Sequence, residues 1–587
     1  MKRLLLHITA IASLLLLPFT AVADPADPSP FTRTQPDGSS ITLTLHGDEY
    51  YSYLTDSDGH VVELGEDGYY HIARSIRPSA FARMQREQQE ARYISAKAIT
   101  TGSPRYLVIL VEFSDLKFVI PQAQTAFSNL LNQEGYSANG GTGSVHDYYY
   151  QNSGGLFSPI FDVIGPVTLD KSYVYYGRQV ISDGNTKHDE HASEALYDAC
   201  EIINAQGNVD FSKYDNDRDG YVDGVFFFFA GYAQSHGGGD DTIWPHASYL
   251  SSFNARYNGV RVYRYACAAE LTGSSGGVMC SIGTFCHEYG HTLGLPDWYD
   301  TDHATNGTAS HPGSFSLMAS GNYNNSSATP PALSAMEKLM LGWKEIPTLS
   351  GNGAKELGPV FSGSGLVVAS HNTDEYFILE SRGGGNIWDS FIPSGMLIYH
   401  VDKSQNYISA ADRTAASLWN SKINCYADHP CYYFLRPEGA AASNASTVFP
   451  GQSGATYFNN LIAWDGSHSG VYLSDISHDS STGTASFTVE SGTVRRVFGT
   501  VSDRSGAPLA GVCVAVAAEA SIQALERRHN NDSQSHKEEV LEIEDAPSVS
   551  GNYVVTDAGG NYSVELSEGG SALRVYASKE GYYNACS

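Results

Sequence analysis

The sequence predicts a multidomain protein in which a mixed α/β (α+β) domain is followed by β-sandwich domains. Three observations support this prediction. The chain has 587 residues, which is more than a single hydrophobic core usually serves. Between residues 104 and 343, short apolar runs alternate with helix-prone stretches. From residue 346 onward, alternating apolar and polar residues are separated by turns rich in Gly, Ser and Asn, a pattern typical of antiparallel strands.

The N-terminal end has the features of a secretion signal. Lys2 and Arg3 precede an apolar run at residues 4–22, and the small residues Ala21 and Ala23 suit signal peptidase. We therefore predict a cleaved signal peptide at residues 1–23 and a secreted protein, either extracellular or in transit through the periplasm or at the cell surface. A retained membrane anchor is the alternative, although no later segment is apolar enough to span a bilayer.

The formal net charge of −29 bears on the partners of the protein. Nucleic acids and anionic membrane surfaces carry the same sign and repel such a field, so we expect neither as a partner. The charge suits a soluble extracellular protein.

Residues 24–100 are predicted to form a separate N-terminal unit. Turn signals at 35–38 and 46–49 separate alternating strands, and residues 80–98 are charged and helix-prone without a clear apolar stripe. The unit contains no cysteine, so a thiol cannot act as a metal-directed plug from within it.

An acidic turn precedes the second long apolar run of the α/β region. Asp215, Asp217, Asp219 and Asp223 place carboxylates at the spacing by which a short loop wraps oxygen ligands around calcium. The turn is not a full EF-hand, because Phe226 occupies the position expected for glutamate. We predict a structural calcium site, with a solvated acidic turn as the alternative.

The most informative segment is HEYGHTLGLPD at residues 287–297. On a helix, His287 and His291 stand four residues apart on one face, so both imidazoles can reach one metal ion. Glu288 lies beside them, where it can take a proton from the attacking water. The pattern predicts a zinc hydrolase.

The residues after the second histidine indicate the third ligand. Gly294 and Pro296 do not continue a helix comfortably, so the chain must turn there and can bring Asp297 under the metal. A rival arrangement takes its third ligand from a glutamate on a later helix, yet no glutamate occurs between Glu288 and Glu337. We therefore predict Asp297 as the third protein ligand of zinc, with a fourth position left for water.

This motif, read as HExxHxxGxxD, resembles the signature of the immune inhibitor A family of secreted bacterial zinc metallopeptidases. The likeness extends over residues 100–405 in the order of the family, except that Phe315 stands where the family usually has Trp. The matching segments are the strand at 103–113, the helix start SVHDYY at 144–149, the methionine turn FSLMASG at 315–321, the helix end LGW at 341–343 and the strand GMLIYHVD at 395–402.

The resemblance implies a metzincin-like zinc peptidase catalytic domain at residues 101–345, with Met318 as a support beneath the metal. It also implies protein or peptide substrates and synthesis as a zymogen whose propeptide is residues 24–100. An N-terminal β-domain that stays in the mature protein is the alternative. If residues 24–100 block the cleft, they must offer an oxygen or nitrogen ligand or lie across the groove, and Asp48 and Glu49 are candidates.

The C-terminal part is predicted to contain two further domains. Residues 346–492 form a β-rich domain packed on the catalytic domain. Residues 493–587 resemble a carboxypeptidase-regulatory-like β-sandwich, with the polar insert at 521–548 as a mobile loop. We expect this sandwich to be truncated, since the chain ends soon after Tyr582, before the last strand that such domains usually have.

The predicted chemistry is peptide-bond hydrolysis, with Glu288 as general base and then as proton donor to the leaving amine. Tyr323 is a candidate donor to the developing oxyanion, and a surface tyrosine in an Asn-rich loop is the alternative. His400 and Asp402 are predicted to be a structural polar pair. Two other functions stay open: an exported adhesin or binding protein that displays a peptidase fold, and a metal hydrolase acting on non-peptide bonds.

Overall fold

The computed structural model describes most of the chain up to residue 491 and separate strands beyond it. The described ranges are 22–48, 52–65, 67–73, 98–182, 186–301, 309–363, 365–419, 422–437, 444–491, 495–501, 507–518, 553–556, 561–566, 573–578 and 585–586. Nearly all of the predicted signal peptide and the whole insert at 521–548 therefore lie outside the described residues. The chain divides into two compact units: Met1–Ser350 with Lys355–Thr456 and Asp475–Phe487, and Gly351–Ala354 with Tyr457–Ser474 and Thr488–Ser587.

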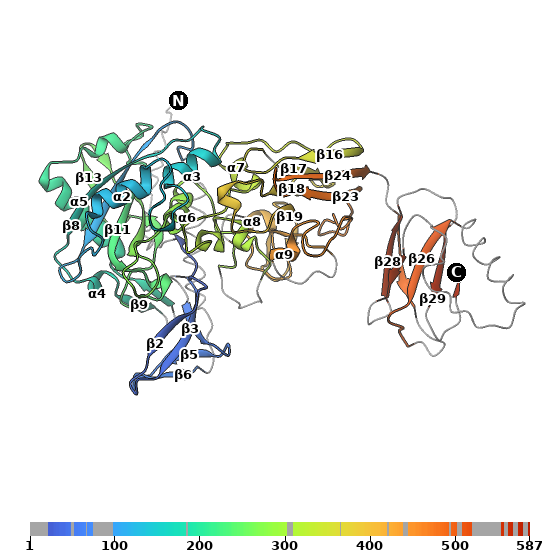
Figure 1. Ribbon diagram of the computed structural model, residues 1–587, viewed down its shortest axis with the longest axis horizontal. Coiled ribbons are helices and arrows are strands. Elements are labelled where there is room, and N and C mark those ends of the chain that lie inside the picture. Colours follow the sequence, from blue (N-terminus) through green and yellow to red (C-terminus); the bar gives the residue numbers. More distant parts are fainter. Residues whose placement is uncertain are drawn as a thin grey trace, which may run out of the picture. The chain divides into compact units, whose positions relative to one another are not determined.

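The N-terminal region contains a five-stranded antiparallel sheet, drawn in blue in Figure 1. The predicted turn at 35–38 is formed, with Gly38 at φ 85° and Asp37 Oδ1 accepting the Ser39 N–H at 2.9 Å. Residues 74–97, which include most of the predicted helix-prone stretch, lie outside the described residues. The strands follow chain order: β2 Phe31–Thr34, β3 Ser40–Gly47, β4 Ser52–Asp56, β5 Val61–Leu64 and β6 Tyr70–Ile72.

A mixed six-stranded sheet forms the centre of the next region, in the order β1-β12-β15-β11-β7-β8. Strands β15, β11, β7 and β8 run parallel, whereas β12 is antiparallel to β15 and β1 is antiparallel to β12. The bounds are β1 Val22–Ala23, β7 Arg105–Glu112, β8 Ile160–Thr168, β11 Val225–Tyr232, β12 His246–Tyr249 and β15 Arg264–Leu271.

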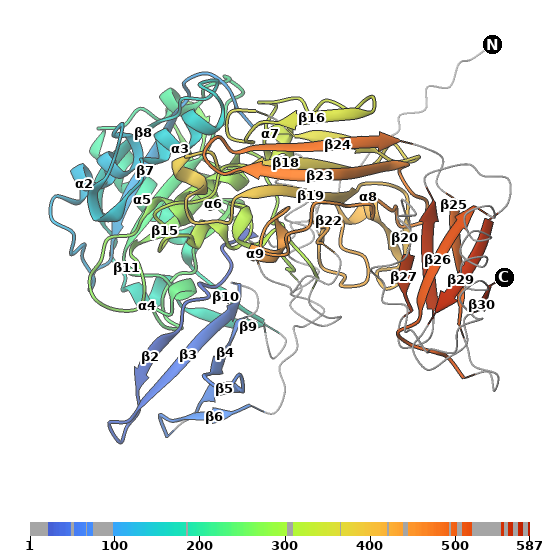
Figure 2. The ribbon, with the colours of Figure 1, turned by 45° about the vertical axis from the view of Figure 1, so that its right-hand side comes forward.

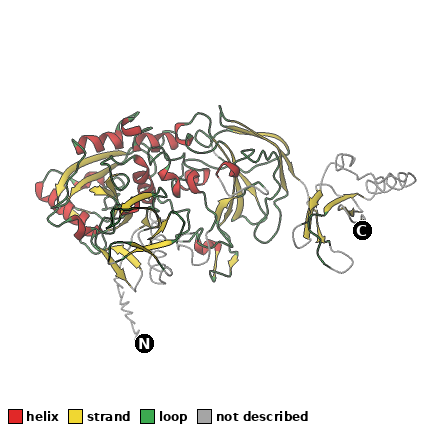
Figure 3. Cartoon of the chain, turned by 60° about the horizontal axis from the view of Figure 1, so that its bottom comes forward, coloured by secondary structure: helices red, strands yellow, loops and turns green. Residues whose placement is uncertain are grey.

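Helices cover both faces of this sheet, because its central strands are apolar on both sides. On β7, Tyr106, Val108 and Leu110 share one hydrophobic cluster with α2, α3 and α6, while Leu107 and Ile109 share another with α5. Figure 3 shows these helices in red around the yellow strands. The helices are α2 Ala123–Asn132, α3 Val145–Asn152, α5 Ala192–Gln206 and α6 Ile282–Thr292.

After α7 (Ala335–Met340), the described residues are mostly strands and loops. An antiparallel sheet has the order β17-β18-β19-β22, and a second sheet has the order β16-β24-β23 (Figure 2). Trp388 and Leu397 belong to the same hydrophobic cluster as Tyr148 of α3, so the first of these sheets shares a core with the catalytic helices. The bounds are β16 Gly353–Leu357, β17 Leu366–Ala369, β18 Glu375–Arg382, β19 Gly395–Asp402, β22 Tyr432–Phe434, β23 Val471–Asp479 and β24 Thr484–Ser491.

The C-terminal strands form two antiparallel sheets, of order β25-β28 and β27-β26-β29-β30. Two antiparallel sheets are the components of a β-sandwich, although the specific likeness to a carboxypeptidase-regulatory domain stays a prediction. The bounds are β25 Arg495–Thr500, β26 Cys513–Ala518, β27 Tyr553–Val555, β28 Asn561–Leu566, β29 Leu573–Ser578 and β30 Ala585–Cys586.

The remaining described elements are short. They are α4 Tyr173–Tyr176, α8 Ala415–Leu418, α9 Asn444–Thr447, β9 Gln179–Ser182, β10 Thr186–Asp189, β13 Arg256–Tyr257, β14 Val260–Arg261, β20 Tyr407–Ile408 and β21 Arg413–Thr414. Among the residues that the structure describes, no helix combines the length and apolar character needed to cross a bilayer. The predicted mixed α/β architecture followed by β-rich regions is confirmed at this level.

Candidate active site

The HExxH motif lies on α6, and every residue of this helix is buried. Two glycines let other segments approach the helix closely. A Cβ on Gly290 would lie 2.8 Å from Met318 Sδ, and a Cβ on Gly283 would lie 1.9 Å from the carbonyl oxygen of Asn322. From α3, the Tyr149 hydroxyl donates to the Cys286 carbonyl oxygen at 2.6 Å. The helix is thus held on several sides by direct contacts.

The structure brings the three predicted zinc ligands together. His287 Nε2 lies 3.2 Å from His291 Nε2 and 3.3 Å from Asp297 Oδ1, and His291 Nε2 lies 3.5 Å from Asp297 Oδ1. Tetrahedral ligands at roughly 2.0–2.1 Å from zinc lie about 3.3–3.4 Å from one another. The triangle of ligand atoms therefore has the size that a single zinc ion requires.

Backbone carbonyls orient both histidine rings. Nδ1 of His287 donates to Leu317 O at 2.8 Å, and Nδ1 of His291 donates to Leu295 O at 2.9 Å. A carbonyl oxygen can only accept a hydrogen bond, so Nδ1 of each histidine carries the proton. Each Nε2 then has a lone pair to offer to a metal ion between the three side chains. Leu295 reaches its place through Gly294, whose φ of 99° makes the turn that the sequence predicted and also leads to Asp297.

Met318 packs against Gly290 of α6 and is fully buried. The turn that carries it is tied down by hydrogen bonds. Trp298 N donates to Met318 O at 2.8 Å, and Trp298 Nε1 donates to Glu337 Oε1 at 3.0 Å. From β18, Arg382 Nη2 donates to Phe315 O at 3.1 Å, so the first β-rich sheet also helps to fix this turn.

The ionisable groups of the triad act on one another: burial lowers the pKa of His287, but Asp297 and Asp24 more than offset this effect and raise it. Burial opposes the charge on Asp297, but His291 and His287 more than offset it and hold the pKa of this carboxyl below its ordinary value. A deprotonated carboxylate is the form that a metal ion needs. Glu288 is also fully buried, so its carboxylate is shielded from bulk water.

Asp24, which the sequence analysis did not single out, lies in the same site and is fully buried. One oxygen of Asp24, one oxygen of Glu288 and one nitrogen of His287 lie within 4.8 Å of one another. Asp24 arrives there because β1 pairs with β12, with Ala23 opposite His246. No spacing pattern in the sequence connects residue 24 with the HExxH helix. Its only distinction is its position directly after the predicted signal-peptide cleavage.

Three side chains donate hydrogen bonds to the Asp24 carboxylate. Asn322 Nδ2 lies 2.5 Å from Oδ1, while the Tyr323 hydroxyl and Thr284 Oγ1 lie 2.8 Å and 3.2 Å from Oδ2. Tyr323, a candidate from the sequence, is therefore at the site and not on an isolated surface loop. Asn322 and Thr284 were missed because a single polar residue in a loop or helix carries no recognisable signal.

The acidic turn gathers only part of its predicted ligand set. Carboxylate oxygens of Asp215, Asp217 and Asp223 lie within 4.8 Å of one another. Asp219 is not part of this group, and its Oδ1 accepts the N–H of Tyr221 at 2.8 Å. Burial, with the neighbouring acidic charges, raises the pKa of Asp223 to about 6 although its bonds from Asn216 work in the opposite direction.

The other residues that the sequence singled out lie elsewhere. Asp48 is buried but is not grouped with the zinc ligands, and Glu49 lies outside the described residues. His400 Nε2 lies 2.9 Å from Glu375 Oε1, and Asp402 Oδ2 lies 2.8 Å from His429 Nε2. These contacts hold strands β18 and β19 to their surroundings, away from the metal triad.

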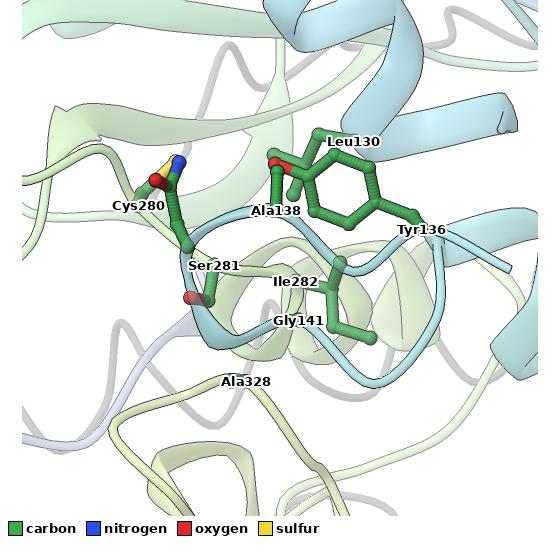
Figure 4. Close-up of a pocket in the computed structure, with 9 residues that line it drawn as sticks. Leu130, Tyr136, Ala138, Gly141, Cys280, Ser281, Ile282 and Ala328 are labelled. Carbon is green, nitrogen blue, oxygen red and sulfur yellow. The ribbon is translucent and has the colours of Figure 1, made fainter.

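A small hollow opens beside the start of α6 (Figure 4). None of its lining residues is charged, and burial raises the pKa of the Cys280 thiol well above its ordinary value, so this thiol stays protonated. The hollow is lined by Leu130, Tyr136, Ala138, Asn139, Gly141, Cys280, Ser281, Ile282 and Ala328.

Comparisons with known proteins find related sequences for the region that contains this site. Residues 95–344 match the profile of the immune inhibitor A peptidase M6 catalytic domain. The chain is 26% identical over 301 residues to the pre-pro-metalloprotease PrtV of Vibrio cholerae serotype O1 (strain ATCC 39315 / El Tor Inaba N16961), covering 44% of this chain and 32% of PrtV. It is also 26% identical over 275 residues to Immune inhibitor A of Bacillus thuringiensis subsp. alesti, covering 40% of this chain and 39% of that protein. The chain thus spans less than two fifths of the length of each of these relatives.

Proposed function

We propose that the chain is a zinc-dependent endopeptidase that hydrolyses peptide bonds in proteins, because residues 95–344 match the immune inhibitor A peptidase M6 catalytic domain. The observation that carries the proposal is the triangle of His287, His291 and Asp297, whose edges of 3.2, 3.3 and 3.5 Å suit one zinc ion. The sequence order of Gly294, Asp297 and Met318 supports a metzincin-like arrangement of this site.

The triad, Glu288 and Met318 have different roles in the proposed reaction. Zinc held by the triad would polarise the scissile carbonyl and lower the pKa of the attacking water. Glu288 takes the proton of that water and returns it to the leaving nitrogen, because its carboxylate lies within 4.8 Å of His287 at the metal side of the helix. Met318 touches no reactant and supports the helix from below.

The edge of β12 is the surface on which an extended substrate fits. In the structure this edge is covered by β1, which pairs antiparallel with residues 246 and 247. Cleavage after Ala23 removes β1 with the signal peptide, and the backbone groups of β12 are then available to add a substrate strand, a common mode of peptide recognition. A groove that binds a polypeptide along a strand edge suits cleavage within chains, hence an endopeptidase.

We also propose that the N-terminal region keeps the enzyme latent, with Asp24 as the plug. Its carboxylate lies beside Glu288, in the place needed by the attacking water. The residues after Asp24 stay in contact with the segment at 235–237, since Asp27 N donates to Ser235 O at 2.9 Å and Arg33 donates to Gly237 O. Asp24 takes the role for which the sequence suggested Asp48 and Glu49. Release requires proteolysis after the β2–β6 sheet, near residues 90–105.

The predicted secretion signal has a direct consequence for this plug. Cleavage after Ala23 would make Asp24 the first residue of the exported chain. Asp24 N donates to Pro245 O at 3.2 Å, and a free α-ammonium group at this position can make the same hydrogen bond. Latency therefore does not depend on keeping Val22 and Ala23.

For the acidic turn, we propose a calcium ion held by Asp215, Asp217 and Asp223, whose carboxylate oxygens converge. Asp219 serves the turn through its backbone contact and is left out of the proposed ligand set. The ion would stabilise the loop ahead of β11 and would take no part in hydrolysis.

The test of function is digestion of casein by the secreted protein, with and without a zinc chelator, beside the Glu288→Gln variant. Glu288→Gln should keep zinc bound while activity falls by about 10²–10⁴-fold, since the ligands remain and the base is gone. Activity that survives both chelation and Glu288→Gln would refute the peptidase assignment. A wild-type form that starts between residues 90 and 105, binds zinc and unmodified proteins, and still cleaves nothing would favour the adhesin alternative.

A further inference from the structure

The carboxylate of Asp24 occupies a cradle of hydrogen-bond donors beside the catalytic base. Asn322 Nδ2 contacts one oxygen at 2.5 Å and the Tyr323 hydroxyl contacts the other at 2.8 Å. Thr284 adds a longer contact of 3.2 Å. Asn322 is fully buried, so its amide cannot exchange this partner for bulk water while the site is closed.

A carboxylate at this place resembles the reacting group of a substrate. It presents two oxygens on one carbon, and one of them lies within 4.8 Å of an oxygen of Glu288 and a nitrogen of His287, beside the place where a scissile carbonyl would gain negative charge during attack by water. Donors that fit the plug therefore also fit the charge that develops on a substrate. The Tyr323 hydroxyl also contacts Pro25 O, the main-chain carbonyl that follows the plug, so it can serve a peptide carbonyl as well as a carboxylate.

We propose that Asn322 and Tyr323 are catalytic residues that bind the carbonyl oxygen of the scissile bond as it becomes negatively charged. The inference rests on the peptidase function proposed above. The water oxygen adds to the carbonyl carbon, its proton passes through Glu288 to the amide nitrogen, and the C–N bond then breaks. Asn322 and Tyr323 donate hydrogen bonds throughout and exchange no proton in the net reaction.

The loop that carries the two donors is held in position before substrate arrives. Gly283 N on α6 donates to Ser327 O at 2.8 Å, and the missing side chain of Gly283 lets the Asn322 carbonyl pack directly against the helix. The His236 ring meets Tyr323 edge-on at 5.5 Å between centroids. Donors fixed in advance stabilise developing charge without a reorganisation cost, which is what this role requires.

The competing explanation is that Asn322 and Tyr323 serve only to hold the plug. The two roles differ in what they predict for the form of the secreted chain that carries the activity. A donor that only holds the plug is irrelevant to turnover there, whereas a donor to the reacting oxygen lowers kcat when it is removed and leaves KM almost unchanged.

The experiment compares Asn322→Ala and Tyr323→Phe with the wild type, using the active secreted form loaded with zinc. Tyr257→Phe is the matched control, because it removes a hydroxyl that donates to the Glu201 carboxylate at 2.7 Å, outside the site. We expect each cradle variant to lose about 10²–10³-fold in kcat with little change in KM, and the control to retain wild-type kinetics. Zinc content and melting temperature should stay at wild-type levels in Tyr323→Phe.

A second measurement does not depend on turnover. Calorimetric titration with a phosphinic peptide, an uncleavable tetrahedral anion, should show weaker binding to both cradle variants by a factor similar to their loss in kcat/KM. Unchanged kcat together with unchanged phosphinic-peptide affinity would overturn the proposal while leaving the peptidase function intact. If Asn322→Ala does not fold, Tyr323→Phe by itself tests the proposal, because this change keeps the aromatic ring and removes only the hydroxyl. A zinc-loaded wild type without peptidase activity would overturn both proposals.

Discussion

At the scale of residues, the ligand triad combines two kinds of positioning. His287 and His291 share one face of α6 and are oriented by the carbonyls of Leu317 and Leu295. Asp297 reaches them only because Gly294 adopts a positive φ, which other residues adopt with strain. The third ligand therefore depends on a turn as much as on its own carboxylate.

Replacing Asp297 by Ala should remove zinc and activity together, because two imidazoles remain where three ligands are needed. We expect zinc affinity to fall by more than about 100-fold, since even loss of an outer-shell partner costs 10–100-fold. Metal analysis of the purified variant checks this. Full zinc occupancy in Asp297→Ala would show that a different residue completes the site.

Replacing Asp24 by Ala should raise the activity of the intact chain. The variant removes the carboxylate beside Glu288 but keeps the backbone hydrogen bonds of this segment, from Asp24 N to Pro245 O and from Asp27 N to Ser235 O, so the block weakens without loss of the fold. Initial rates on a short fluorogenic peptide, with the intact N-terminus verified by mass spectrometry, provide the measurement. Asp37→Ala, at an exposed turn of the same region, is the control. Equal activity of intact wild type and Asp24→Ala would argue against Asp24 as the plug.

At the scale of elements, the assembly of the site depends on how closely the loop that carries Asn322 packs against α6. The helix tolerates no side chain at Gly283, where a Cβ would lie 1.9 Å from the Asn322 carbonyl oxygen. The atom in the way is a backbone oxygen, which cannot move aside as easily as the end of a flexible side chain. The sequence of α6 is therefore constrained on the side facing the loop as well as on the side facing the metal.

Gly283→Ala should displace the loop that carries Asn322 while leaving the zinc triad in place. We expect a loss of about 1–3 kcal/mol in unfolding free energy, typical of overpacking, and reduced activity at normal zinc content. Gly358→Ala is the matched control, because a Cβ there meets nothing within 4 Å. Thermal denaturation and zinc analysis provide the measurements. A fully stable and active Gly283→Ala would mean that the loop adapts freely.

The acidic turn yields a prediction about calcium. Adding calcium should raise the melting temperature of the wild type, because an ion bound only by the folded state stabilises it by mass action. Asp217→Ala should abolish this rise with little change in initial turnover, and Asp170→Ala, at an exposed aspartate outside the turn, should retain it. If the wild type shows no calcium-dependent shift, the turn is only solvated charge.

At the scale of the whole molecule, the N-terminal region and the catalytic region are joined through the active site. Asp24 contacts Thr284, Asn322 and Tyr323, which lie 260, 298 and 299 positions away along the chain. Further contacts follow Asp24, since Asp27 N donates to Ser235 O at 2.9 Å and Arg33 donates to Gly237 O. Removal of this region must therefore change access to the site, whatever its effect on folding.

Processing should convert the exported chain from a latent to an active form. When Glu288→Gln protein is incubated with active enzyme, we expect cleavage between residues 90 and 105, after the β2–β6 sheet. A wild-type form that starts in this interval should be markedly more active than the uncut chain on the same peptide substrate. N-terminal sequencing and initial rates check the two parts. Equal activity of the cut and uncut forms would make residues 24–100 a permanent domain.

The sequence by itself determined the features that depend on local geometry. The i, i+4 spacing of His287 and His291 places both on one helix face without reference to the rest of the fold, and the apolar run at 106–113 predicts the buried strand β7. Such patterns need only the periods of helices and strands, which is why the α/β character and the proximity of His287 and His291 could be predicted. The sequence could not show which aspartates of the acidic turn converge, because Asp217 and Asp219 look alike in a linear pattern.

Only the tertiary structure decided what lies opposite the triad. Asp24, Asn322 and Thr284 carry no spacing signal, since they come from a terminal segment, a loop and a buried helix that meet only after folding. A hydrogen bond across nearly 300 residues depends on the paths of all the elements between its partners, and a linear pattern cannot encode those paths. The motif could suggest the proposed zinc site because His287, His291 and Asp297 are near neighbours in the chain. The plug and the donors around it became visible only when distant segments were brought within hydrogen-bonding distance.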